Sequence, residues 1–202
     1  MTNTCIILGY GVFIKPNHDY QKYLESSLED ALNHKPDKII TCAGCSKPKY
    51  PTLSEAVSMK NLFLESHPEL STIIVTEEQS LSTPQSLEFS QKFVEPGNVF
   101  IYCDSIRVPK VLYLAISLYF KNLTEKEKIE TIGKIYISQN PDVSKKVVLT
   151  YQHITVVGTP LSNTIELASQ QIVSSMLEMH AFDYPDLHQQ FIDWRKKQWG
   201  VK

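Results

Sequence analysis

The chain has 202 residues and a mass of 23.1 kDa, a size at which proteins usually keep a single core. Its composition of 42% hydrophobic, 10% aromatic and 21% charged residues excludes a disordered or low-complexity protein, which would not bury enough apolar surface to fold. Twenty Lys and Arg residues against 22 Asp and Glu give a formal net charge of -2, which argues against nucleic acid as a partner because duplex binding requires a basic face.

Short apolar runs rich in β-branched residues predict four buried strands in the first half of the chain. They lie at residues 4–9 (TCIILG), 38–43 (KIITCA), 72–76 (TIIVT) and 99–103 (VFIYC). Between them, residues 19–33, 53–66 and 84–94 carry apolar side chains at helical spacing. Repeated strand–helix–strand units of this length imply parallel strands with right-handed crossovers.

The second half of the chain adds one more strand and the closing helices. Residues 154–158 (ITVVG) predict the fifth strand, and residues 163–179 and 186–198 predict two helices. Thr124 and Glu127 form the pattern of a capping box, which predicts a short surface helix within residues 121–134. Residues 134–138 and 146–151 are β-rich and are interpreted as an edge hairpin.

The predicted fold class is therefore α/β, with residues 1–202 in one domain. We expect a three-layer Rossmann-like sandwich with a mainly parallel central sheet of about five strands flanked by helices. The helices of residues 163–198 are expected to pack on that domain.

The cysteines and the apolar runs predict a soluble cytoplasmic protein. No run approaches the ~20 residues of a membrane span, and the first residues lack the pattern of a signal peptide. The four cysteines are too few for a disulfide scaffold; they are Cys5, Cys42, Cys45 and Cys103. Cys42 and Cys45 form a CxxC. A redox pair requires a helix N-terminus beside it to lower the thiol pKa, but prolines after Cys45 place the start of the next helix further along the chain. A structural zinc site requires a second pair of ligands, and the sequence offers none at suitable spacing. Buried structural thiols are the main interpretation, a thiol-redox protein is the lesser alternative, and no metal is required.

Candidate site residues are those that follow each strand, because ligands of such sheets bind outside the carboxyl ends of the strands. Gly9 and Gly11 follow the first strand and allow the backbone to approach a ligand closely, although the third glycine of a dinucleotide fingerprint is missing. Gly44 follows the second strand, and Lys47 and Lys49 behind it would attract an anion.

Glu55 has two interpretations. It lies three residues after Thr52 and is either the capping-box partner of that residue or a carboxylate that faces the ligand.

The segment after the third strand, TEEQSLSTPQS, predicts the start of a helix. Hydroxyl residues precede Pro84, a pattern typical of a helix N-terminus, and the free N–H groups there suit a phosphate or another anion. We therefore expect Ser80 and Thr83 to bind ligand. Glu77, a carboxylate at a partly buried strand end, is the candidate catalytic residue as a general base.

Arg107 and Lys110 lie in the first turn of a very apolar helix, VLYLAISLYF. Cations near a helix N-terminus oppose the helix dipole. Two cations at a position where the helix dipole disfavours them, with no local compensation, indicate a functional site. We therefore expect both side chains to bind an anion.

These segments, in this order, resemble the YdcF/SanA/ElyC-like family (domain of unknown function 218). The counterparts of its motifs are Gly9 and Gly11, Ala43-Gly44, Glu55-Ala56, Glu77-x-x-Ser80-x-Ser82-Thr83-x-Gln85-Ser86 and Arg107-x-x-Lys110. Arg107 stands where the family has His, and Lys110 where it has Arg. The resemblance implies a divergent member with a Rossmann-like fold and a ligand pocket at the strand ends. It also implies the soluble branch of a family whose membrane-anchored members act in the cell envelope.

The leading functional hypothesis is a small-molecule-binding protein or enzyme with a pocket for an anionic or nucleoside-like ligand. Phosphorylated and sugar-like molecules are candidates, as is S-adenosylmethionine, whose ribose diol suits a carboxylate. If the protein is an enzyme, a hydrolase or transferase is expected. The alternative is a non-catalytic regulatory or interaction protein that keeps the fold without the family's catalytic groups. Trp194, Trp199 and Phe191 in the last helix predict packing or an oligomer contact, which allows for a homo-oligomer.

Overall fold

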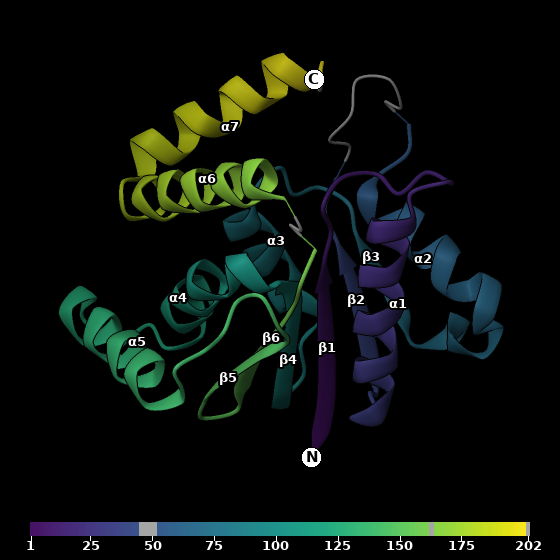
Figure 1. Ribbon diagram of the computed structural model, residues 1–202, viewed down its shortest axis with the longest axis horizontal. Helices are drawn as coiled ribbons and strands as arrows, with labels where there is room; N and C mark the ends of the chain where they lie inside the picture. The colour runs from purple at the N-terminus through teal and green to yellow at the C-terminus, as the bar shows by residue number, and fades with distance from the viewer. Residues whose placement is uncertain (45–51, 162–163, 201–202) are drawn as a thin grey trace.

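The protein is an α/β sandwich in which a six-stranded sheet separates two layers of helices (Figure 1). The computed structural model describes residues 1–44, 52–161 and 164–200. The strand order is β3-β2-β1-β4-β6-β5, with every neighbouring pair parallel except β5 and β6. The strands are β1 (Thr2–Leu8), β2 (Lys38–Cys42), β3 (Ile74–Glu77), β4 (Gly97–Asp104), β5 (Val147–Tyr151) and β6 (Ile154–Thr159). The predicted fold class is confirmed, with one strand more than expected.

The helices form three groups around the sheet (Figure 1). One face carries α1 (His18–Asn33) and α2 (Glu55–Ser66), and the other carries α3 (Thr83–Ser90), α4 (Val108–Tyr119) and α5 (Glu125–Gln139). The third group, α6 (Ile165–Asp183) and α7 (Pro185–Trp199), lies beyond the ends of the parallel strands. Short 3-10 turns occupy Pro68–Thr72, Gln91–Phe93 and Ser105–Arg107.

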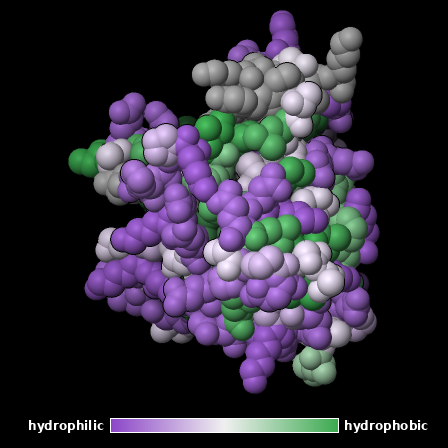
Figure 2. Space-filling model, turned by 90° about the vertical axis from the view of Figure 1, so that its right-hand side faces the viewer, coloured by the Kyte–Doolittle hydropathy of each residue, from purple (hydrophilic) through white to green (hydrophobic). Residues whose placement is uncertain are grey.

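Each strand of the sheet interior is buried on both faces. Along β1, Ile6 and Leu8 pack into the core shared with α4, whereas Cys5 and Ile7 pack into the core shared with α1 and α2. All four side chains are at most 1% exposed. This is why the strand sequences are continuous apolar runs rather than alternating ones. By contrast, the outer surface over α1 and α2 is mainly hydrophilic, with small hydrophobic patches (Figure 2).

The predicted edge hairpin is half right. Residues 147–151 form β5, which pairs antiparallel with β6. Residues 134–138 are instead the last turns of α5, which begins at the predicted capping box of Thr124 and Glu127. Ile132, Ile135 and Tyr136 pack against the core from this helix. Their i, i+3, i+4 spacing is helical, and it outweighs the β-branched composition of the segment.

A crevice is expected where the sheet changes direction, between β1 and β4. The chain leaves β1 for α1 on one face and leaves β4 for α4 on the other, so the two connections diverge (Figure 1). The helices α6 and α7 lie above this point (Figure 1). Among the described residues, no helix is both long enough and apolar enough to span a membrane.

Candidate functional site

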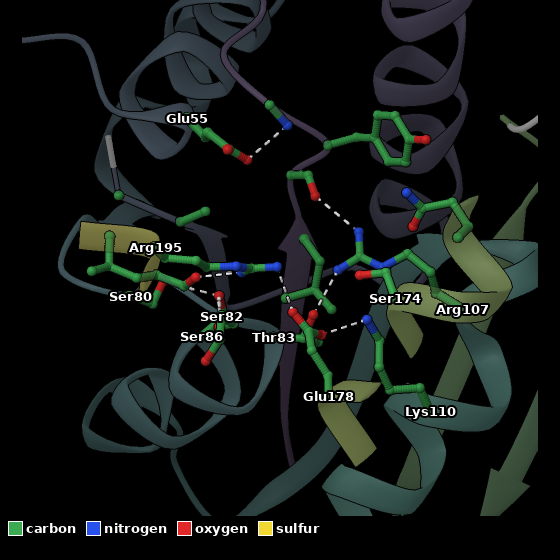
Figure 3. Close-up of a pocket in the computed structure, with 18 of the residues that line it drawn as sticks. Glu55, Ser80, Ser82, Thr83, Ser86, Arg107, Lys110, Ser174, Glu178 and Arg195 are labelled. Carbon is green, nitrogen blue, oxygen red and sulfur yellow. Dashed lines mark hydrogen bonds and ion pairs between the residues drawn. The ribbon is translucent and has the colours of Figure 1, made fainter. Parts of the chain in front are cut away.

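A cavity of about 390 Å³ lies at the carboxyl ends of the strands, beneath α6 and α7. It is lined by the loops after β1, β2 and β3 and by the first turns of α2, α3 and α4 (Figure 3). One side of α6 and the Arg195 side chain of α7 complete the lining. All eight residues predicted from the sequence to bind ligand lie in its wall, namely Gly9, Gly11, Gly44, Glu55, Ser80, Thr83, Arg107 and Lys110. Segments that are far apart in the chain, from Leu8 to Arg195, thus meet around one space.

Arg107 is the central cation of the cavity. It follows β4 in the 3-10 turn Ser105–Arg107, where the carboxylate of Asp104 accepts a hydrogen bond from the N–H of Ile106. Its side chain donates hydrogen bonds to the carbonyl oxygen of Gly9 and to Oγ1 of Thr83, each over 3.0 Å. An arginine has five N–H donors, so three remain, and the buried Nε finds no partner among the described residues.

No carboxylate of the described residues forms an ion pair with Arg107, although this residue is only 8% exposed. A buried charge costs free energy unless it is paired and hydrogen-bonded. Burial acts to lower the pKa of Arg107, but the electrostatic effects of Cys103, Glu178, Tyr23 and Asp104 outweigh it and raise the pKa. With no carboxylate in direct contact, the guanidinium still has donor capacity left for a bound anion.

Lys110 has its own counter-ion. Its Nζ lies 2.6 Å from Oε2 of Glu178, and Nη2 of Arg195 lies 2.8 Å from the other carboxylate oxygen. Glu178 comes from α6 and Arg195 from α7, so this ion triad fastens both helices over the cavity (Figure 3). Because Glu178 neutralises Lys110, less of the charge of Lys110 is available to an anion bound at Arg107 than the sequence predicted.

Burial and charge shift the pKa values of the triad. Burial lowers the pKa of Lys110 to about 8, and Glu178 offsets only part of this effect. For Glu178, burial acts to raise the pKa, but the positive charges of Lys110 and Arg195 outweigh it and lower the pKa to about 2. At neutral pH the triad is therefore ionised, with two cations sharing one carboxylate.

The cavity carries a net positive charge. Among the lining residues that the structure describes, three cations, Arg107, Lys110 and Arg195, face two carboxylates, Glu55 and Glu178. Arg107 and Arg195 extend into the cavity from opposite sides (Figure 3). The pKa of Arg195 is lowered by burial and further by the charge of Arg107. An anion between the two guanidinium groups would relieve this repulsion.

The glycine loop after β1 shapes the cavity but keeps its N–H groups for the protein. Gly11 has a φ of 103°, a conformation that favours glycine. Its N–H donates to Oε2 of Glu55 over 2.9 Å, and a Cβ at Gly9 would lie 2.5 Å from the same oxygen. The N–H groups of Gly9 and Tyr10 donate to the carbonyl of Cys42 and to the hydroxyl of Tyr20. The loop thus contributes surface rather than backbone donors.

Gly44 is required by close packing between two loops. A Cβ there would lie 2.6 Å from the carbonyl oxygen of Glu78 and 2.9 Å from that of Ser80. The Gly44 N–H donates to the Ser80 carbonyl over 2.8 Å. The predicted anion-attracting residues Lys47 and Lys49 lie outside the described residues.

The helix starts differ in detail from the prediction. Ser54, not Thr52, is the N-cap of α2, and its hydroxyl accepts a hydrogen bond from the N–H of Val57. Glu55 is therefore not the capping-box partner of Thr52, and its carboxylate fastens the glycine loop instead.

In α3, Ser82 is the N-cap and Pro84 lies in the first turn, as the pattern predicted. The N–H groups of Ser82 and Thr83 form no hydrogen bond within the part of the chain that the structure describes. They remain available at the edge of the cavity.

Glu77 does not line the cavity. Its side chain is buried, and its Oε1 accepts hydrogen bonds from the N–H groups of Gln79 and Ser80, at 2.7 and 3.0 Å. The carboxylate therefore holds the turn that carries Ser80 to the cavity wall. This position does not support the predicted role of Glu77 as a general base.

The sequence reasoning missed the contribution of the C-terminal helices. From α6, the cavity is lined by Leu167, Gln170, Gln171, Ser174 and Glu178, and from α7 by Arg195. The α6 residues recur at helical spacing and form a mostly polar stripe beside an apolar one that includes Ile172, Val173, Met176 and Leu177. This stripe indicates a helix face in a polar environment, but the local sequence does not show which part of the molecule that face contacts.

The cysteines behave as buried structural thiols. Cys5, Cys42 and Cys103 are fully buried, and burial raises the pKa of Cys5 and Cys103 to about 12 and that of Cys42 well above its ordinary value. A thiol of this kind supplies no thiolate for redox chemistry. Cys45, the other half of the CxxC, lies outside the described residues.

Comparisons with known proteins found no match to a family model, to a curated protein or to a solved structure. Within residues 1–44, 52–161 and 164–200, no cluster of three or more His, Cys, Asp or Glu side chains has the arrangement of a metal site. The cavity and its charges are therefore the basis for a functional proposal.

Proposed function

We propose that this protein binds a small anionic molecule in the cavity at the ends of β1 and β4. The carrying observation is the buried guanidinium of Arg107, which has hydrogen-bonding partners but no carboxylate partner among the described residues. Carboxylates and phosphates are the acceptors that an arginine recognises best, because its planar guanidinium can donate two parallel hydrogen bonds to either group.

Three further features support an anion as the ligand. The N–H groups of Ser82 and Thr83 at the start of α3 form no hydrogen bond within the described residues, and the Thr83 side chain is bonded to Arg107. A helix N-terminus favours negative charge. The cavity has one positive charge in excess. Its volume of about 390 Å³ falls within the range of about 300–1,000 Å³ that is common for small-molecule sites.

Among the candidate ligands, phosphorylated or carboxylated molecules fit the charge best. S-adenosylmethionine carries a cationic sulfonium, which a positively charged cavity repels. The proposal agrees with the motif resemblance to the YdcF/SanA/ElyC-like family, which implies a ligand pocket at the strand ends and involves several of the same residues. We include no chemical step in the proposal, because Glu77 holds a turn behind the cavity.

Calorimetric titration with inorganic phosphate and pyrophosphate tests the proposal, with thermal unfolding as a second readout. A ligand of the native state raises the unfolding temperature by mass action. We expect Arg107→Gln to weaken anion binding at least tenfold, since hydrogen bonds to a charged group contribute about 1.5–3 kcal/mol, and Arg107→Lys to retain part of the affinity.

The matched control is Lys38→Gln. Lys38 is a partly buried cation that donates to the backbone carbonyl of Phe93, at the opposite end of the sheet from the cavity. This variant should bind anions like the wild type. Equal binding by Arg107→Gln and Lys38→Gln, or no binding by the wild type, would contradict the proposal.

A further inference from the structure

An apolar groove of about 680 Å³ lies between α6 and α7. Its apolar walls are Val173 and Leu177 of α6 and Phe191 and Trp194 of α7. Val173, Leu177 and Trp194 are 56%, 59% and 56% exposed. Soluble proteins rarely leave a contiguous apolar surface of this kind without a use for it.

The groove adjoins the anion cavity. Gln170, Ser174 and Arg195 line both spaces. On α6, the row Gln170, Ser174, Glu178 faces the cavity, whereas the neighbouring row Ser169, Val173, Leu177 faces the groove, with Gln170 and Ser174 on the border. One helix thus forms a polar wall for one space and an apolar wall for the next.

Arg195 marks the border between the two spaces. Its Nη2 pairs with Glu178 at the cavity, while the centre of its guanidinium lies 4.3 Å from the ring centroid of Phe191 in the groove. A ligand that extends from Arg107 past Arg195 therefore leaves a positively charged environment and enters a hydrocarbon-like one.

We infer that the ligand is amphiphilic, with an anionic head group in the cavity at Arg107 and an alkyl or acyl chain in the groove between α6 and α7. This inference rests on the proposed anion-binding function. The occupant of the groove is selected by its position beside the cavity, with three residues lining both spaces: it is the apolar part of the molecule whose charged part binds in the cavity. Neither space alone provides both the charge and the apolar surface that such a molecule requires.

The test is calorimetric titration with a series of one head group and increasing chain length, namely inorganic phosphate and butyl, hexyl and octyl phosphate, each below its micelle concentration, with octanol as the uncharged probe. Burial of each methylene should raise the affinity about two- to fourfold, so that octyl phosphate binds far more tightly than butyl phosphate. Octanol, which lacks the head group, should bind weakly.

Two matched double variants assign this gain to the groove. Val173→Asn with Leu177→Gln replaces both apolar residues that α6 contributes to the groove. Ile172→Asn with Met176→Gln makes the same kind of change one residue earlier on the helix. Ile172 and Met176 are 50% and 66% exposed and do not line the groove. The groove variant should bind octyl and butyl phosphate almost equally, while the control keeps the chain-length dependence. Both variants should unfold at temperatures near that of the wild type, since all four positions are exposed.

The outcomes separate this inference from the function on which it rests. If inorganic phosphate binds through Arg107 but octyl phosphate binds no more tightly than butyl phosphate, the amphiphilic ligand is refuted and anion binding stands. If the affinity of the groove variant still rises with alkyl chain length, the alkyl chain binds elsewhere, and the inference is also refuted. The same holds if that variant instead dissociates a homodimer in sedimentation, because a second copy of the chain then covers the groove. If no member of the series binds, both proposals fail.

Discussion

Arg107 donates a hydrogen bond from Nη2 to Oγ1 of Thr83 over 3.0 Å, which joins the end of β4 to the start of α3 in the wall of the cavity. Both side chains are almost completely buried. The bond orients the guanidinium and leaves the N–H of Thr83 beside it for a ligand. Because the Thr83 hydroxyl holds the Arg107 guanidinium in position, the loop after β4 and the start of α3 contribute to one binding site.

Replacement of Thr83 by valine tests this relationship. Thr83→Val keeps the shape of the side chain but removes the acceptor, which leaves a buried donor of Arg107 unsatisfied. We expect the free energy of unfolding to fall by about 1–3 kcal/mol and phosphate binding to weaken, as measured by urea denaturation and calorimetry. The control is Thr150→Val, at an exposed position on β5, which should alter neither. Unchanged stability and affinity in Thr83→Val would show that the hydroxyl does not position Arg107.

The ion triad predicts a large cost for removal of its carboxylate. Glu178→Gln leaves Lys110 and Arg195 as neighbouring buried cations with no counter-ion in the triad. Loss of one partner of a buried ion pair costs about 3–5 kcal/mol, measurable as the free energy of unfolding in urea. The double variant Lys110→Met with Glu178→Gln should recover part of this loss, because it removes one of the two repelling charges. A double variant less stable than Glu178→Gln would argue against the triad.

Sulfate affinity should depend on pH through Lys110. Burial lowers the pKa of Lys110 to about 8 in the folded protein, from 10.5, so the ammonium loses its proton as the pH rises through 8. The cavity then loses its excess positive charge, and we expect sulfate binding to weaken about tenfold between pH 7 and pH 9.5. Sulfate itself does not titrate in this range. Lys110→Met should bind sulfate more weakly at pH 7 and without this pH dependence; a wild-type profile that is flat across pH 8 would contradict the assignment.

Glu77→Gln should leave ligand binding nearly unchanged. The glutamine side-chain oxygen still accepts the hydrogen bonds from Gln79 and Ser80 that the carboxylate accepts in the wild type. We expect phosphate affinity within about twofold of the wild type, since a neutral acceptor replaces a charged one outside the cavity wall. Glu77→Ala, which removes the acceptor altogether, should lower the unfolding temperature. A loss of binding in Glu77→Gln at unchanged stability would instead place its charge in the site.

The amino-acid sequence by itself determined the sheet and the edge of the sheet at which the site lies. The runs around Ile6 and Ile101 are continuously apolar because both faces of β1 and β4 are covered, and parallel strands place their following loops at one edge. Gly11, Thr83 and Arg107 could therefore be assigned to a common edge from the predicted parallel arrangement of the strands. The segment at residues 134–138 was misassigned because a β-branched composition was given more weight than helical spacing.

Only the tertiary structure decided which groups at that edge remain available to a ligand. The N–H groups of Gly9 and Gly11 are occupied by Cys42 and Glu55, and the charge of Lys110 is neutralised by Glu178, a residue 68 positions away. Such pairings depend on how α6 and α7 pack over the strand ends, and short-range periodicity carries no information on that packing. Hydrogen bonding and charge neutralisation act between atoms a few ångströms apart, so only the folded arrangement reveals that Arg107 lacks an ionic partner among the described residues.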